Sequence, residues 1–254
     1  MMNTVGMKTL LSKEVRRFLR VPGQTVLSPL VSTTLYFLVF GYGLNGQQHR
    51  VEGVTYLVFI VPGLVFLGIA NNAFLNSSSS LFITKIQGTI VDLLAAPLGP
   101  VELLFGFLGG AMVRGLSVGV LTWAVATAFT GVHLAHPLTT VAFLLLISYV
   151  FSVLGLLAGL WAEKFEQINF FPTFIMLPLT FLGGVFYSIR SLPAPFDTLS
   201  LFNPMVYMVD GLRYGLLGVQ VMSPAVGALI LVTLAAASTA LAGGLLRSGY
   251  HLKT

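Results

Sequence analysis

Long apolar stretches recur along this chain, and they restrict its possible folds more than any other feature. Only 8% of the residues are charged, whereas an ordinary soluble domain carries about 25% charged residues. The chain therefore has too few polar side chains to cover a globular surface. Within lipid the backbone must satisfy its own hydrogen bonds, which allows helices or a closed barrel. Because the apolar runs are continuous rather than alternating, we expect an all-α integral membrane protein.

About six stretches are long enough to cross a bilayer as helices, and they form one transmembrane domain over residues 1–254. The expected spans are residues 24–44, 54–76, 101–130, 137–160, 168–187 and 225–246. Pro62 and Gly63 predict a kink in the second span. The third span contains glycines at four- and five-residue intervals that would let a neighbouring helix approach closely. These glycines are Gly106, Gly110, Gly115 and Gly119.

Residues 77–100, between the second and third spans, are too polar to cross a membrane. Their apolar side chains follow the spacing of a single helical face: Ile83, Ile86, Ile90, Leu93 and Leu94. The other face carries Lys85, Gly88, Thr89 and Asp92, and the pattern ends at Pro97 and Pro100. This pattern predicts a short amphipathic helix at the membrane surface. Its polar face either meets a soluble partner or is simply solvated.

A second amphipathic pattern covers residues 7–20. Phe18 belongs to its apolar stripe, and most of its other face is basic: Lys8, Lys13, Arg16, Arg17 and Arg20. Basic helices of this kind lie in the headgroup region of a membrane. The charged start of a signal peptide would look similar, but the next apolar run is long enough to span and no small-residue cleavage site is evident. We therefore expect a retained interfacial helix.

The lysines and arginines predict the orientation of the chain. One set of segments comprises the N-terminal helix, residues 77–100, the loop after the fourth span and the C-terminal tail, and it holds nine of the 13 cations. The opposite set holds only Arg50, Arg190 and Arg213. Both termini and the amphipathic segment at 77–100 are therefore predicted to be cytoplasmic. We attribute the net charge of +5 to this orientation rather than to nucleic-acid binding.

Few residues are placed to carry chemistry. The chain has no glycine-rich phosphate loop ending in Gly-Lys-Ser/Thr, so ATP hydrolysis by that route would require a partner. We expect no catalytic, cofactor-binding or metal-binding residues, because the spaced pair His133 and His136 lacks further ligands. Glu163 and Glu166 lack a nucleophile or base. Arg114 lies midway along the third span, where it lines a path, pairs across a helix interface or extends toward the membrane surface.

Three segments resemble one protein family when they are taken together. They are the basic N-terminal helix, the sequence DLLAAPLGPVELLFGFLGGAMVRG at 92–115 and the sequence PLTFLGGVFYSIRSLPAPFDTLSLFNPMVYMVDGLRYGLLG at 178–218. In combination they resemble the membrane permease subunit of a bacterial ATP-binding-cassette transporter of the type-2 export class. The resemblance covers nearly the whole chain.

The resemblance implies a permease of six spans that pairs with a second permease, as a homodimer or a heterodimer. Two copies of a separate cytoplasmic ATPase would bind ATP and Mg²⁺ and dock on a coupling helix between the second and third spans. The residues carried over to that helix are Lys85, Ile86, Gln87, Gly88, Thr89, Ile90, Asp92, Leu93, Leu94 and Pro97. The interfacial helix would contribute Lys13, Arg16, Arg17, Phe18 and Arg20.

The resemblance also implies a re-entrant extracytoplasmic hairpin at 183–218 that caps the exit before the sixth span. Residues of a pathway or permease interface would be Arg114, Gly183, Gly184, Phe186, Tyr187, Asn203, Pro204, Tyr207 and Arg213. Such a permease of the bacterial inner membrane would export a lipid-linked, glycan or hydrophobic substrate from the cytoplasm or inner leaflet. Aromatic side chains in the second half of the chain suit an amphipathic cargo.

Two other functions are compatible with a helical membrane protein. A secondary transporter or channel needs no ATPase, but it would ordinarily show carboxylates at the bilayer midplane or inverted repeats. An intramembrane enzyme acting on lipid would need a catalytic constellation. The sequence shows neither feature.

Overall fold

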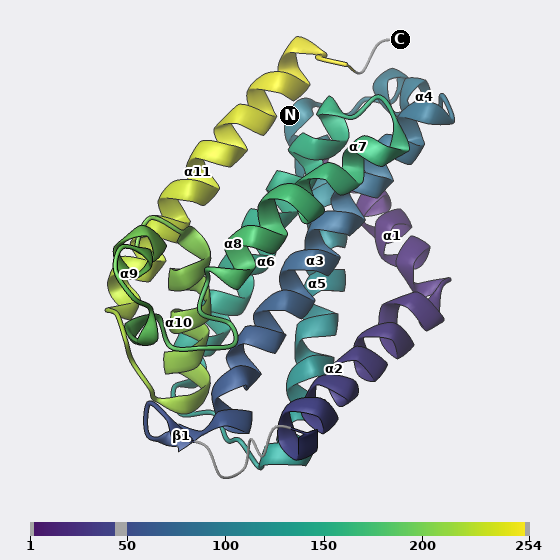
Figure 1. Ribbon diagram of the computed structural model, residues 1–254. Coiled ribbons are helices and arrows are strands. Elements are labelled where there is room, and N and C mark those ends of the chain that lie inside the picture. The colour runs from purple at the N-terminus through teal and green to yellow at the C-terminus, as the bar shows by residue number, and fades with distance from the viewer. Residues whose placement is uncertain (1–2, 44–49, 252–254) are drawn as a thin grey trace.

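The computed structural model describes residues 3–43 and 50–251, which form a bundle of tilted helices (Figure 1). Four helices of the described residues are long and apolar enough to cross a membrane. They are α3 (Tyr56–Ile86), α5 (Pro100–Thr130), α6 (Pro137–Trp161) and α11 (Pro224–Ser248). The predicted third, fourth and sixth spans are confirmed as helices to within about two residues at each end.

The predicted first and fifth spans are helical runs made of shorter pieces. The first joins two π-helical turns, η1 (Gly23–Leu27) and η2 (Val39–Gly43), through α2 (Ser28–Leu38), and its predicted last residue lies outside the described residues. The fifth joins α7 (Phe165–Phe170), the π-helical η3 (Phe171–Met176) and α8 (Leu177–Phe181). Pro172 and Pro178 cannot donate backbone hydrogen bonds, which favours the widened turn between them.

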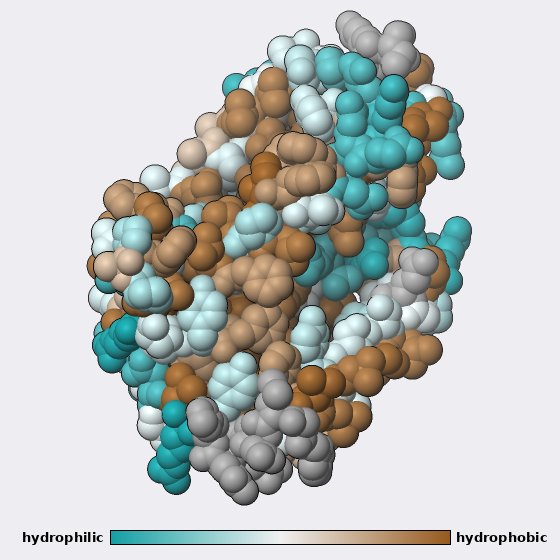
Figure 2. All heavy atoms as spheres, in the orientation of Figure 1, coloured by the Kyte–Doolittle hydropathy of each residue, from teal (hydrophilic) through white to brown (hydrophobic). Residues whose placement is uncertain are grey.

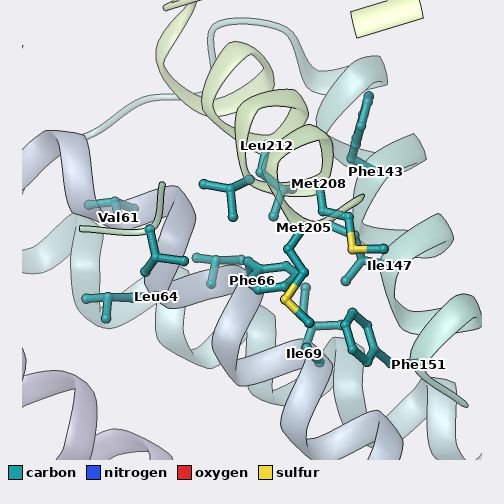
Figure 3. Packing of buried hydrophobic residues seen from close by; sticks show 14 of the residues in the cluster. Val61, Leu64, Phe66, Ile69, Phe143, Ile147, Phe151, Met205, Met208 and Leu212 are labelled. Carbon is teal, nitrogen blue, oxygen red and sulfur yellow. The ribbon is translucent and has the colours of Figure 1, made fainter. Parts of the chain in front are cut away.

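Helix α3 is the centre of the bundle and packs against α5 and α6 along its length. Glycines let both neighbouring helices approach α3 closely, as predicted for the third span. A Cβ on Gly119 would overlap Ile69 of α3, and one on Gly155 of α6 would overlap the carbonyl of Phe74. The main core lies among α3, α6 and α10 (Pro204–Leu217), where Phe66, Phe151 and Met205 pack together (Figure 3).

The helix of α3 continues through Pro62 without a break in its assignment. Gly63 lets the backbone of Val185 approach, because a Cβ on Gly63 would lie 2.7 Å from the Val185 carbonyl oxygen. The predicted fifth span stops at Phe181, six residues early. A turn follows it, in which Gly184 has a φ of +69°, a conformation that suits glycine.

The predicted amphipathic helix at 83–97 is wrong as a single element. Helix α3 runs ten residues past the predicted end of the second span and stops at Ile86, and a separate short helix, α4 (Ile90–Ala95), follows. The serine run at 77–80 lies within α3, and its hydroxyls are satisfied by carbonyls of the preceding turn, as Ser78 donates to Phe74 at 2.9 Å. The break comes at Gly88, where φ is +71°.

The remaining segments lie at the two ends of the bundle. Helix α1 (Thr4–Leu19) packs on α5, and its start lies at the same end as α4, α7 and the end of α11 (Figure 1). At the other end, part of the predicted loop is an antiparallel ribbon of β1 (Arg50–Val51) and β2 (Val54–Thr55). The segment before α11 contains η4 (Ile189–Ser191) and α9 (Phe196–Ser200), followed by α10.

The polarity of the surface follows this arrangement. Figure 2 shows hydrophilic residues gathered around α4 and α7 and hydrophobic residues over the middle of the face drawn. The segments that carry most of the basic residues therefore meet at one end of the molecule, as the charge pattern required. The side of the membrane on which this end lies stays a prediction.

Candidate functional site

The turn between α3 and α4 projects from the end of the bundle. Gln87, Gly88, Thr89 and Asp92 are exposed, as predicted for a surface that meets a partner. The apolar residues of the segment do not share one buried face. Ile90 is 5% exposed and Leu93 is partly buried, but Ile86 is 64% exposed.

Two further apolar side chains are exposed beside Ile86, namely Val91 at 64% and Leu94 at 41%. We call Ile86, Val91 and Leu94 the tip patch. Sequence periodicity missed Val91, because the break at Gly88 restarts the helical register. Exposed apolar residues beside polar ones are typical of a surface that binds another protein.

Lys85 has a different position from the one expected. Its side chain turns back to the end of α6, where Nζ donates hydrogen bonds to the carbonyl oxygens of Gly159 at 3.2 Å, Leu160 at 2.8 Å and Ala162 at 2.9 Å. The last carbonyls of a helix have no intrahelical donors and carry partial negative charge. Lys85 therefore caps α6 and fixes the end of α3 against it.

The start of α1 is fastened to the segment that follows α4. The backbone N–H of Asn3 donates to Glu102 Oε1 at 2.9 Å, and Asn3 Nδ2 donates to the carbonyl of Pro97 at 3.0 Å. Asn3 Oδ1 in turn accepts from the N–H of Gly6 at 2.9 Å, so it caps the helix. Pro97 thus lies where α1, α4 and α5 meet.

A buried carboxylate joins α1 to α3 further along. The side chain of Glu14 is fully buried, and its Oε2 accepts hydrogen bonds from Ser80 Oγ at 2.6 Å and from Arg17 Nε at 3.2 Å. It lies over Gly110 of α5, where a Cβ would overlap it. Sequence reasoning missed Glu14. Its place four residues after buried Leu10 and four before buried Phe18 was the available signal.

The guanidinium groups of two arginines converge on Asn76 of α3. Arg17 Nη2 donates to the Asn76 carbonyl at 2.9 Å and to Asn76 Oδ1 at 3.0 Å. Arg114 Nη1 lies 3.5 Å from the same Oδ1, so Arg114 pairs across the interface of α5 with α3. We call Glu14, Arg17, Asn76, Ser80 and Arg114 the polar network. It couples three helices directly behind the exposed turn.

Three residues expected on the interfacial helix point outward. Lys13, Arg16 and Arg20 are exposed, whereas Arg17 is half-buried and Phe18 is buried. The basic face predicted from the sequence is therefore present except at Arg17, which turns into the polar network.

Arg114 also lines a polar groove of about 370 Å³ between α2, α3 and α5. Amide and hydroxyl side chains surround the groove, among them Asn71 and Asn72 of α3 and Ser28 and Ser32 of α2. Polar groups at this depth of a membrane protein usually face water or a transported molecule. The groove gives Arg114 such an environment.

Arg213 and Asp210 lie inside the opposite end of the bundle. Arg213 is 1% exposed, donates from Nη2 to the Gly184 carbonyl at 2.8 Å and places its guanidinium carbon 4.0 Å from the centre of the Phe59 ring. Asp210 Oδ1 lies 3.7 Å from Arg213 Nη1, and Oδ2 accepts from the N–H of Met222 at 2.8 Å. Burial raises the pKa of the Asp210 carboxyl, against the opposing effect of these partners.

The other predicted pathway residues stabilise the same end. Asn203 Nδ2 donates to the Leu179 carbonyl at 2.6 Å, and Tyr207 and Tyr187 donate to the carbonyls of Leu201 and Phe181. Phe186 stacks on Phe40 of η2 with ring centres 5.7 Å apart. Gly183 packs near Met205, and Pro204 begins α10. The structure brings these residues together around the α8–α10 connection, and Arg114 lies apart from them.

The sequence of this chain is similar to a known protein family and to named membrane proteins. A family model described as ABC-2 type transporter matches residues 6–217. The chain is 40% identical over 216 residues to the inner membrane transport permease YadH of Escherichia coli strain K12, which covers 85% of this chain and 84% of that protein. It is 24% identical over 196 residues to nodulation protein J of Rhizobium leguminosarum biovar viciae, covering 76% of this chain and 75% of the relative.

Proposed function

The chain belongs to the ABC-2 type transporter family, and on that basis we propose that it is the permease of an exporter driven by a separate cytoplasmic ATPase. It is a membrane transport permease and not an enzyme, as its family and its relative in Escherichia coli indicate. The finer parts of the proposal concern the docking surface, the assembly and the cargo.

The ATPase docks on the exposed turn and on the tip patch. This surface combines the polar residues Gln87 and Asp92 with the apolar residues Ile86, Val91 and Leu94, the mixture that protein interfaces carry. Lys85 anchors the turn to α6, and Asn3 ties the following segment to α1. A force applied at the turn therefore reaches several helices at once. This connection is the observation that carries the proposal.

The working assembly holds two permeases, which we propose to be identical, and two ATPase subunits that bind ATP and Mg²⁺. It lies in the bacterial inner membrane with about six spans per permease and with the α4 end, including both termini, in the cytoplasm. The nine cations in the segments assigned to that side support this orientation. The segment from Gly183 to Gly218 forms the re-entrant hairpin that caps the outer end.

The cargo is a lipid-linked, glycan or hydrophobic molecule that leaves the cytoplasm or the inner leaflet. The polar groove beside Arg114 supports a cargo with hydroxyl or anionic groups, because its amides and hydroxyls can replace water around such groups. The aromatic cluster around Phe186 supports a cargo that also has an apolar part.

Co-purification with a nucleotide-binding subunit tests the proposal. The tagged permease, expressed with an ABC ATPase subunit from the same bacterium, should retain that subunit in detergent and stimulate ATP hydrolysis in proteoliposomes. Asp92→Lys or Gly88→Trp should abolish both effects while membrane insertion is unchanged. Glu166→Lys is the matched control, since Glu166 is an exposed acid at the same end and the charge change is identical. Transport that proceeds without any ATPase would instead identify a secondary transporter.

A further inference from the structure

A large apolar groove lies on the opposite side of the bundle from the polar groove. It has a volume of about 670 Å³ and runs between α6, the helical segment 165–181, α10 and α11. Phe151 and Met208 form its inner wall, where they pack with the main core (Figure 3). Its outer walls are Ile175 and Leu241, which are 40% and 56% exposed. The groove is therefore open at the side of the molecule.

The groove stays open because α11 and the segment 165–181, which form its outer walls, each pack on other helices. Helix α11 packs on α6 and α10, and the segment 165–181 packs on α3 through α7. The π-helical turn η3, which contains Pro172, widens that segment where Phe171, Ile175 and Met176 line the groove. Widened turns of this kind are frequent at functional sites.

The lining determines what can occupy the groove. It is almost wholly hydrocarbon, formed by Phe, Leu, Ile, Met, Trp and Pro side chains with one Tyr. Water needs two to four polar partners and would find almost none here. The groove is open at the side of the molecule, so whatever surrounds the bundle can enter it. Within a bilayer, the hydrocarbon of the lipids surrounds the bundle.

The end of the groove near α7 has the features of a headgroup site. Trp161 and Tyr250 line it there, and aromatic side chains of this kind lie at the level of lipid headgroups. Tyr250 stacks on His251 with ring centres 4.1 Å apart, and His251 Nε2 lies 3.9 Å from Glu163 Oε1. This end of the groove therefore suits the interfacial part of a phospholipid, and its apolar length suits an acyl chain.

We propose that this groove binds one acyl chain of a bilayer phospholipid, whose headgroup lies at the rim near Trp161 and Tyr250. The lipid fills the space between α11 and the segment 165–181 and is a structural component of the folded permease. The site is separate from the polar groove and from the ATPase-docking turn. It requires only that the chain is embedded in a bilayer, so it stands independently of the proposed cargo.

The two tryptophans of the chain provide the test. In a Trp123→Phe protein, Trp161 is the remaining tryptophan and lines the groove. Phosphatidylglycerol with a dibrominated acyl chain is titrated into this delipidated protein in detergent, and quenching should saturate at one lipid per chain. Adding Leu154→Phe and Leu241→Phe, which place two rings in the groove, should weaken the apparent affinity about tenfold by excluding several methylene groups. Leu229→Phe, on an exposed position of α11 outside the groove, should not.

Several results would overturn the proposal. Quenching that rises linearly without saturation, or that is equal in the filled variant, would mean that Trp161 meets only the surrounding lipid layer. The chain has no cysteine, so Leu241→Cys can also be tested for oxidative dimerisation against Leu229→Cys. A covalent dimer through residue 241 alone would show that a second copy fills the groove.

Discussion

Glu14 of α1 and Ser80 of α3 share a hydrogen bond of 2.6 Å inside the bundle, although 66 residues separate them in the chain. This contact turns an interfacial helix into a fixed part of the transmembrane domain. Together with Arg17 and Asn76 it makes α1 move with α3, directly behind the turn to which the ATPase is proposed to bind.

We expect Glu14→Leu to destabilise the protein by about 2 kcal/mol, because it leaves Ser80 Oγ and Arg17 Nε without their acceptor. Glu14→Gln should cost less, since an amide oxygen can still accept from Ser80. Thermal unfolding in detergent measures both changes. Glu163→Gln, at an exposed position, is the control, and an equal loss there would remove the special role of Glu14.

Gly110→Leu should separate α1 from α5, because even a Cβ at Gly110 would overlap the side chain of Glu14. The expected result is a lower melting temperature and release of α1 to limited proteolysis. Gly244→Ala is the matched control, since nothing lies within 4 Å of a Cβ there. Alanine should be tolerated in that helix, with a gain of up to about 1 kcal/mol. A proteolysis-resistant α1 in Gly110→Leu would contradict the packing.

Lys85→Met should loosen the contact between the end of α3 and the end of α6, because three carbonyl oxygens lose their shared donor. Hydrogen exchange at residues 159–162 should quicken, and ATPase stimulation should fall while the ATPase still binds. Lys8→Met, which removes an exposed lysine from α1, should change neither measurement. Loss of ATPase binding itself would instead make Lys85 a direct contact.

Arg213→Met should destabilise the end of the molecule near the β-ribbon by about 3–5 kcal/mol, because it leaves Asp210 buried without its cation. Adding Asp210→Asn should restore part of this loss, since an amide can still accept from the backbone at Met222. Chemical or thermal unfolding of the single and double variants forms the required cycle. Additive losses would mean that the two side chains act independently.

Arg114→Leu should reduce transport more than stability. Arg114 lines the polar groove, and its one hydrogen bond among residues 3–43 and 50–251 is long, at 3.5 Å to Asn76. Arg114→Lys should retain part of the transport, since the charge remains but the planar guanidinium does not. Export measured in reconstituted vesicles at equal protein content checks this. Transport at the original rate in Arg114→Leu would exclude a role in the pathway.

The helices whose ends are marked by nearby proline or glycine residues could be predicted well. Helix α5 begins at Pro100 and ends before Gly131, which has a φ of +66°, and both residues lie at the edges of an apolar run. Helix α6 likewise begins at Pro137. Apolar length together with proline and glycine boundaries contains all the information that such helices need.

The position at which α3 ends and the contacts of the polar network could not be predicted from the sequence in the same way. The serines and threonine at 77–84 made this segment look too polar to continue the second span, but in the structure their hydroxyls bond within the helix or to Ser152 and Glu14 of other helices. These partners lie far away in the sequence. The direction of Lys85 toward α6 depends on the same distant packing, and a single sequence with helical periodicity cannot supply it.

The unbroken length of α3 has one mechanical consequence. Its 31 residues form a rod about 46 Å long, well beyond the roughly 30 Å of a hydrocarbon core. One tip, Ile86, adjoins the exposed turn, and at the other the hydroxyl of Tyr56 bonds to the carbonyl of Phe186 at 3.0 Å. Tight glycine contacts hold α3 near its middle, so a tilt about this point moves its two ends in opposite directions. In the proposed dimer, a tilt that spreads the Ile86 ends of two such rods would draw their Tyr56 ends together.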